Sequence, residues 1–156
     1  MTIALEERTA AQQALEDARV AAAAAGTPYA GGVAPEIAWA LFKAGDALLV
    51  DVRTAEERKF VGNVPDSLHV PWATGTSLTR DPRFVRELEA KTGKDAPVLL
   101  LCRSGNRSAQ AAEAAAKAGF MQVFNVLEGF EGDPDAKQRR GGQNGWRFRS
   151  LPWAQD

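Results

Sequence analysis

Residues 98–108 read Val-Leu-Leu-Leu-Cys-Arg-Ser-Gly-Asn-Arg-Ser and carry the strongest structural signal in this chain. The four apolar residues follow Pro97, and a short apolar run bounded by a turn residue is typical of a buried strand. The segment from Ser108 to Ala118 is rich in Ala, which favours a helix, and Gly119 ends it. The sequence therefore predicts a strand, a tight loop and a helix in succession.

A second unit of the same kind lies upstream. Ala47 to Val52 is a nearly continuous apolar run, the pattern of a parallel strand that is covered on both faces. The segment from Pro35 to Gly45 before it predicts a short amphipathic helix with Pro in its first turn. After the run, Thr54 and Glu57 have the spacing of a capping box, which begins the next helix.

Three weaker signals complete the pattern. Leu68 to Val70 and Gln122 to Val126 are strand candidates, and a helix is expected from Asp81-Pro82 to a stop at Gly93. Strands that alternate with helices predict an α/β fold with a mostly parallel sheet of four to five strands and helices on both faces. Ligands bind such sheets beyond the carboxyl ends of the strands, which directs attention to the residues after Leu101.

The N-terminal part differs in composition from the rest. Residues 1–25 contain ten Ala and are followed by Gly26-Thr27-Pro28, which predicts a helix and its end. Few large apolar side chains are present to anchor it. We therefore divide the chain into an N-terminal helical extension, residues 1–30, and one domain, residues 31–156. The extension is expected either to lie on the domain or to contact a second copy in a homodimer.

Composition excludes several classes of protein. Nineteen Lys and Arg against twenty Asp and Glu give a formal net charge of −1, which does not suit a nucleic-acid binder. One Cys and one His allow neither an internal disulfide nor a Cys/His zinc site, and we expect no metal and no cofactor. No apolar run reaches the ~18 residues of a membrane span, and the acidic N-terminus is unlike a signal peptide, so we expect a cytoplasmic protein without a membrane partner.

The loop after the strongest strand carries the chemistry. Cys102 is placed at a strand end before a helix N-terminus, whose partial positive charge favours a thiolate. The guanidinium groups of Arg103 and Arg107 are expected to lower the thiol pKa further and to bind an anion. The backbone of the other loop residues is expected to form a cradle of amides around the sulfur, and these residues are Ser104, Gly105, Asn106 and Ser108.

Several residues outside the loop have weaker indications. Asp51 and Arg53 are expected to form a fixing ion pair, and the single His69 is expected to have a structural role. Trp72 and Phe130 are candidates for the mouth of the pocket. The C-terminal part is basic, and these charges predict either a solvated surface or attraction of anions toward the loop. They are Lys137, Arg139, Arg140, Arg147 and Arg149.

Four segments of the chain match a known family. They are Leu49-Val50-Asp51-Val52-Arg53, Val61 to Ser67, the loop Cys102 to Ser108, and Val126-Leu127-Glu128-Gly129-Phe130. Together they resemble the rhodanese-like sulfurtransferases over about residues 33–153. Two departures stand out. Gly62-Asn63-Val64-Pro65-Asp66-Ser67 replaces a common Gly-His-Ile-Pro-Gly-Ala, and the long segment 131–145 indicates that the usual closing helix is displaced or shortened.

The resemblance implies a rhodanese-like fold and a sulfur-transfer reaction. In that family the cysteine that matches Cys102 takes a sulfane sulfur from an anionic donor such as thiosulfate. It becomes a persulfide and passes the sulfur to a thiophilic acceptor such as cyanide or a thiol. Arg103 and Arg107 would bind the donor, and the loop amides would surround the transferred sulfur. This role requires a thiol that a substrate can reach and that is already ionised.

Two other interpretations remain open at this point. Cysteine phosphatases and arsenate reductases also hold an anion on such a loop, but phosphatases place the clamping Arg one position later, where this chain has Ser108. A rhodanese-like module without catalysis could sense sulfur or oxidants through Cys102, or could bind a partner. Turnover of thiosulfate would separate the enzyme from the sensor.

Overall fold

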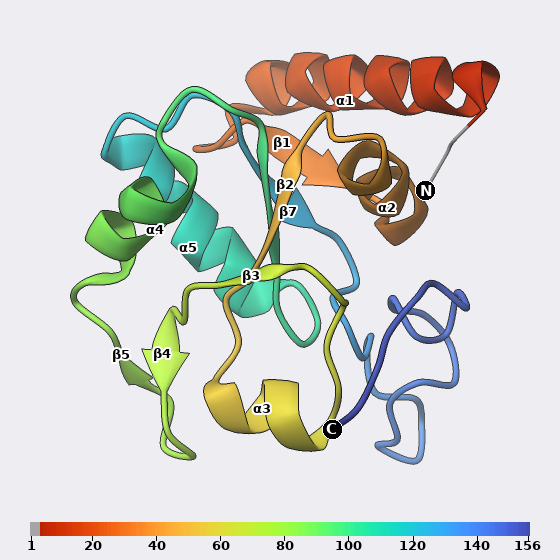
Figure 1. Cartoon of the computed structure of the whole chain (residues 1–156), viewed down its shortest axis with the longest axis vertical. Coiled ribbons are helices and arrows are strands. Elements are labelled where there is room, and N and C mark those ends of the chain that lie inside the picture. The colour runs from red at the N-terminus through yellow and green to blue at the C-terminus, as the bar shows by residue number, and fades with distance from the viewer. Residues whose placement is uncertain (1–3) are drawn as a thin grey trace.

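The computed structural model describes residues 4–156 of the chain (Figure 1). The helices are α1 (Leu5–Ala25), α2 (Pro35–Lys43), α3 (Ala55–Phe60), α4 (Phe84–Thr92) and α5 (Asn106–Lys117). The strands are β1 (Gly31–Val33), β2 (Leu48–Asp51), β3 (Leu68–His69), β4 (Ala73–Thr74), β5 (Thr79–Arg80), β6 (Val98–Leu101) and β7 (Val123–Val126).

Five of the strands form one parallel sheet in the order β1-β7-β6-β2-β3. All neighbouring strands in it run parallel, which confirms the predicted α/β fold. β6 lies at the centre, with Leu101 opposite Asp51 of β2. The remaining strands, β4 and β5, form a separate antiparallel hairpin.

The core lies on both faces of the sheet because the buried strands are apolar throughout. Leu99 and Leu101 of β6 pack with residues of α1 and α2, whereas Val98 and Leu100 pack with residues of α4 and α5. Figure 1 shows the strands between α2 on one side and α4 and α5 on the other. Side chains that alternate across a strand thus fill two separate clusters.

The structure contains two features that the sequence analysis missed. β1 consists of Gly31, Gly32 and Val33, and the low strand propensity of glycine concealed it. Its conformation depends on neighbours: β1 pairs with β7, and a Cβ on Gly31 would lie 2.8 Å from the carbonyl oxygen of Ala18 in α1. The β4–β5 hairpin has only two residues in each strand, too few for a pattern.

Element boundaries differ from the predictions by a few residues. α5 begins at Asn106 rather than at Ser108, since Gly105 is its N-cap residue, and α4 begins at Phe84 rather than at Asp81-Pro82. Residues 127–156, all of which the structure describes, contain no helix. The C-terminal segment instead returns to the domain, where Trp146 is buried and Ala154 pairs with Asn63.

The N-terminal helix α1 packs on its own domain. Leu15 and Ala11 are buried in the cluster that includes α2, and Arg8 forms an ion pair with Asp46. Residues 1–3 of the expected 1–30 extension lie outside the described residues, and a homodimer through the extension stays a prediction. None of the helices in residues 4–156 combines the length and the apolar character that crossing a membrane requires.

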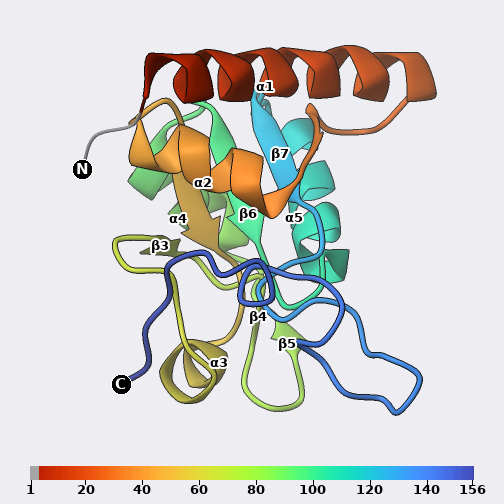
Figure 2. The ribbon, with the colours of Figure 1, turned by 90° about the vertical axis from the view of Figure 1, so that its right-hand side faces the viewer.

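Figures 1 and 2 place α1 at one end of the molecule and α3 with the β4–β5 hairpin at the other. α3 follows β2, and the loop containing Cys102 follows β6. The carboxyl ends of these strands therefore point away from α1, toward the end where the topology rule predicts a ligand site.

Candidate active site

Cys102 follows β6 directly and begins the loop that leads into α5. Its Sγ accepts a hydrogen bond from the Gly105 backbone N–H, with 3.1 Å between the heavy atoms, and lies 3.2 Å from Ser108 Oγ. Gly105 has φ +104°, which brings its amide toward the sulfur. Of the expected cradle, Gly105 and Ser108 lie within hydrogen-bond distance of Sγ, whereas Ser104 and Asn106, within the fully described loop, form no hydrogen bond to it.

The thiol is far less accessible than the sequence analysis expected. Cys102 is 1% exposed and packs with Val98 and Leu100 in the cluster next to α5. A sulfur compound can reach Sγ only if residues that cover it move aside.

Asn125 of β7 supports the loop, and the sequence analysis missed it. Its Nδ2 donates to the carbonyl oxygen of Gly105 at 3.2 Å, and its Oδ1 lies within hydrogen-bond distance of Ser108 Oγ. The Ser108 hydroxyl has one proton and can donate it either to Asn125 or to the sulfur of Cys102. A polar residue inside a buried strand was the signal that could have identified Asn125.

The segment after β7 forms the back of the loop. The Phe130 N–H donates to the carbonyl oxygen of Cys102 at 2.7 Å, and the Glu131 N–H donates to that of Arg103 at 2.9 Å. Gly129, at φ +69°, lies so close that a Cβ would be 2.4 Å from the carbonyl carbon of Arg103. The Leu-Glu-Gly-Phe segment of the sequence thus fixes the course of the backbone around Cys102.

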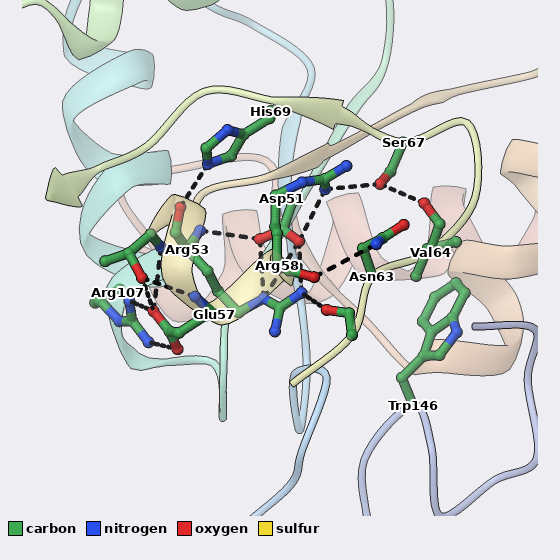
Figure 3. Close-up of polar contacts among 12 residues, drawn as sticks. Asp51, Arg53, Glu57, Arg58, Asn63, Val64, Ser67, His69, Arg107 and Trp146 are labelled. Carbon is green, nitrogen blue, oxygen red and sulfur yellow. Dashed lines mark hydrogen bonds and ion pairs between the residues drawn. The ribbon is translucent and has the colours of Figure 1, made fainter. Parts of the chain in front are cut away.

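Arg107 is held by a carboxylate from another element. Its two terminal nitrogens donate to Glu57 of α3 at 2.7 and 2.8 Å, as Figure 3 shows. Burial opposes ionisation of Glu57, but hydrogen bonds from Arg107 and from the Thr54 N–H outweigh it and lower the pKa of Glu57 to about 2. The hydrogen bonds between Arg107 and Glu57 also raise the pKa of Arg107.

Glu57 itself is fixed by the capping box that the sequence predicted. Thr54 Oγ1 accepts from the Glu57 N–H, and Glu57 Oε1 accepts from the Thr54 N–H, both at 3.1 Å. The sequence analysis assigned Glu57 only this helix-capping role. Its contact with Arg107 joins residues fifty positions apart, which no local pattern indicates.

Arg103 pairs with a different carboxylate. Its side chain is 48% exposed, and its Nε lies 3.4 Å from Glu131. Both arginines line an open cleft of about 350 Å³. Its walls come from α3, the β4–β5 hairpin, the Cys102 loop and the segment after β7; they are Thr54, Glu56, Glu57, Val61, Gly75, Thr76, Leu78, Arg103, Arg107 and Glu131.

Asp51 and Arg53 form the expected ion pair in the interior below the site. Arg53 donates to Asp51 through Nε and Nη2, the shortest distance being 2.7 Å, and both side chains are fully buried. Arg58 adds a second guanidinium to Asp51 at 3.0 Å (Figure 3). Arg53 also donates to the carbonyl oxygen of Gly62 and stacks on the ring of Phe130, 4.3 Å from its centroid. The pair thus anchors the start of α3 to the sheet.

The two aromatic candidates for the pocket mouth were assigned incorrectly. Phe130 is fully buried between the guanidinium groups of Arg53 and Arg147, and Trp72 packs edge-on against Phe84. Neither lines the cleft, because both side chains pack in the apolar interior. His69 has a structural contact, as expected: its Nε2 lies 2.8 Å from the carbonyl oxygen of Arg53.

The basic C-terminal residues are largely engaged within the chain. Arg149 pairs with Glu128 at 2.7 Å, and these hydrogen bonds lower the pKa of Glu128. Arg147 lies 3.8 Å from Glu131, and Arg140 donates to the carbonyl oxygen of Gly132. Within residues 4–156 no three His, Cys, Asp or Glu side chains gather as a metal site would require. The chemistry available here is that of one thiol, a backbone amide and paired charges.

Comparison with known proteins assigns the architecture. Residues 34–133 match the family model of the rhodanese-like domain. The thiosulfate sulfurtransferase GlpE of Pseudomonas savastanoi pv. phaseolicola is 37% identical over 100 residues, which cover 64% of this chain and 82% of that protein. The uncharacterized protein RP600 of Rickettsia prowazekii is 36% identical over 112 residues, 69% of this chain and 83% of that one.

A solved structure agrees with this assignment. The crystal structure of Rv0390 from M. tuberculosis is 46% identical, with a TM-score of 0.73, and the match covers 82% of this chain and 99% of that one. The family match spans the strand β6, the Cys102 loop and the segment Leu127 to Glu131 that backs it. This chain therefore belongs to the rhodanese-like domain family.

Proposed function

We propose that this protein is a sulfurtransferase that carries a sulfane sulfur as a persulfide on Cys102. The observation that carries the proposal is the position of Sγ at the end of β6, where it accepts from the Gly105 amide at the N-terminus of α5. Such an environment stabilises negative charge on sulfur. Similarity to the thiosulfate sulfurtransferase GlpE supports the same reaction.

The reaction has two balanced steps. The Cys102 thiolate attacks the outer sulfur of thiosulfate, the S–S bond of the donor breaks, and sulfite leaves with the electron pair. A thiophilic acceptor, cyanide or a thiolate, then attacks the outer sulfur of the persulfide and releases the Cys102 thiolate. Neither step needs a general base when the nucleophile reacts as its anion. Arg103 and Arg107, which line the cleft, are the groups proposed to meet the anionic donor.

The test is the intact mass of the protein after incubation with thiosulfate. We expect one added sulfur per chain, removable by cyanide with formation of thiocyanate. Cys102→Ser should gain no sulfur and show no turnover while keeping its thermal unfolding, since Ser is close to Cys in size and the site is held by backbone contacts. Sulfur transfer by this variant would refute the assignment.

One observation favours a second function. The 1% exposure of Cys102 suits a module that senses sulfur or oxidants without rapid turnover. Such a module would acquire sulfur or an oxidised thiol at Cys102 but would not catalyse repeated formation of thiocyanate from thiosulfate and cyanide. Multiple-turnover kinetics decide between the two functions.

A further inference from the structure

Both arginines of the Cys102 loop are already paired with carboxylates of this chain. Glu57 holds Arg107 with two hydrogen bonds, and Glu131 lies 3.4 Å from Arg103. The two glutamates come from different elements, α3 and the segment after β7. The Arg107–Glu57 pair is only partly exposed, at 16% and 19% of the two side chains, so solvent screens it weakly.

The lining of the cleft has more negative than positive charges. Three glutamates, Glu56, Glu57 and Glu131, face two arginines in this lining. Arg147, which does not line the cleft, also lies 3.8 Å from Glu131. The other lining residues carry no charge. The loop sequence alone suggests a cationic anion site, but the tertiary structure gives the cleft a lining of net charge −1.

This balance affects ligands of opposite charge in opposite ways. An anionic compound must compete with Glu57 and Glu131 for the guanidinium groups, and it is repelled by Glu56. A compound with an ammonium group gains from the same carboxylates. Glu57 remains ionised at any pH near neutrality because its pKa is lowered to about 2. Charge complementarity of this kind selects among ligands of similar size.

We propose that Glu57 and Glu131 determine acceptor specificity, so that this cleft delivers sulfur to thiols that carry a positive charge, such as aminothiols, in preference to anionic thiols. The inference rests on the proposed function, because the sulfur comes from the Cys102 persulfide. The acceptor thiolate attacks the outer sulfur and the S–S bond breaks. The electron pair stays on Cys102 Sγ, and the acceptor leaves as its own persulfide. The transfer needs no added oxidant or reductant.

The test compares two acceptors of similar size. Protein loaded with thiosulfate and freed of donor is mixed with cysteamine, which is cationic, or with 3-mercaptopropionate, which is anionic. Loss of sulfur is followed by intact mass. The ratio of the two rates in each variant is divided by the wild-type ratio, which cancels the intrinsic reactivity of the thiols. Glu57→Gln and Glu131→Gln should each lower the cysteamine preference by about two- to five-fold at low ionic strength.

A second readout separates specificity from damage to the fold. Loading by thiosulfate should become faster in Glu57→Gln and Glu131→Gln, because each releases an arginine to the anionic donor. A purely structural defect would slow both half-reactions. Gln at position 57 can also keep the capping box, and thermal unfolding checks each variant.

Glu87→Gln is the matched control. Glu87 of α4 lies 3.8 Å from Arg83, so its substitution removes the same charge and one contact of an arginine, but neither residue lines the cleft. Its acceptor ratio and loading rate should equal those of the wild type. An unchanged ratio in both cleft variants, with normal loading, overturns this inference alone. A wild-type protein that never gains sulfur overturns the proposed function and the inference together.

Discussion

Glu57 has three separate roles in the structure. Glu57 completes the capping box of α3, forms hydrogen bonds with Arg107 at the start of α5 and lines the cleft. Its carboxylate contributes most to stability when it is ionised, because the ion pair with Arg107 requires the charged form. The stability of the protein should therefore depend on the protonation of this one side chain.

Acid titration tests this dependence. The pKa of Glu57 is lowered from 4.5 to about 2 in the folded protein. As the pH falls, this carboxylate is therefore protonated at a higher pH in the unfolded chain than in the folded protein. Its contribution to the free energy of unfolding is complete above pH 4.5 and is lost as the pH falls toward 2. Wild-type protein should thus lose stability more steeply than Glu57→Gln in this interval, as measured by urea denaturation. Parallel pH profiles would contradict the expectation.

At the scale of elements, the active-site loop depends on a segment that is distant in the sequence. The β6 strand places Cys102 at the carboxyl end of the central strand. The carbonyl oxygen of Cys102 accepts a hydrogen bond from the Phe130 N–H, and that of Arg103 accepts one from the Glu131 N–H. Close approach of the two segments is possible because Gly129 has no side chain. The loop and the segment after β7 therefore form one unit.

Gly129→Ala should disrupt this unit. The positive φ alone costs about 1–3 kcal/mol for a residue with a Cβ, and the contact at 2.4 Å with backbone atoms of Arg103 adds to it. We expect both lower thermal stability and reduced sulfur loading of Cys102. Gly26→Ala is the control: Gly26 has nearly the same φ, +71°, but a Cβ on it would have no neighbouring atom within 4 Å. Equal losses in the two variants would show that the close contact is unimportant.

At the scale of the whole molecule, α1 and the cleft lie at opposite ends. α1 packs on α2 and β1 at one end of the molecule, whereas α3 and the β4–β5 hairpin, which contribute to the cleft, lie at the other end (Figure 2). The sheet connects the two ends without any polar network that passes from α1 to Cys102 in residues 4–156. Changes in α1 should then alter how much protein is folded but not what the folded protein does.

Leu15→Ala tests this separation. Leu15 is 5% exposed in the core cluster, and such truncations cost about 2–5 kcal/mol. The variant should unfold at lower temperature, yet sulfur loading per folded chain should match the wild type. Val20→Ala, on the same helix at a position that is 61% exposed, should change stability by less than about 0.5 kcal/mol. A loading defect in Leu15→Ala below its unfolding temperature would contradict the separation.

The sequence by itself determined the elements whose signals are local. The apolar runs of β2 and β6, the capping box at Thr54 and the Ala-rich α5 are formed by neighbouring residues, and the same local signals are enough to place Cys102 at a strand end. β1 and the β4–β5 hairpin could not be predicted, since glycine and two-residue strands form no periodic pattern.

Only the tertiary structure decided the electrostatics and the access of the site. Glu57 and Glu131 reach the loop arginines from distant positions in the chain, and packing against α5 buries Cys102. The physical reason is that charge pairing and burial depend on distances in space, which sequence spacing does not specify. A loop that is cationic in the sequence is therefore neutralised by carboxylates that folding brings to it.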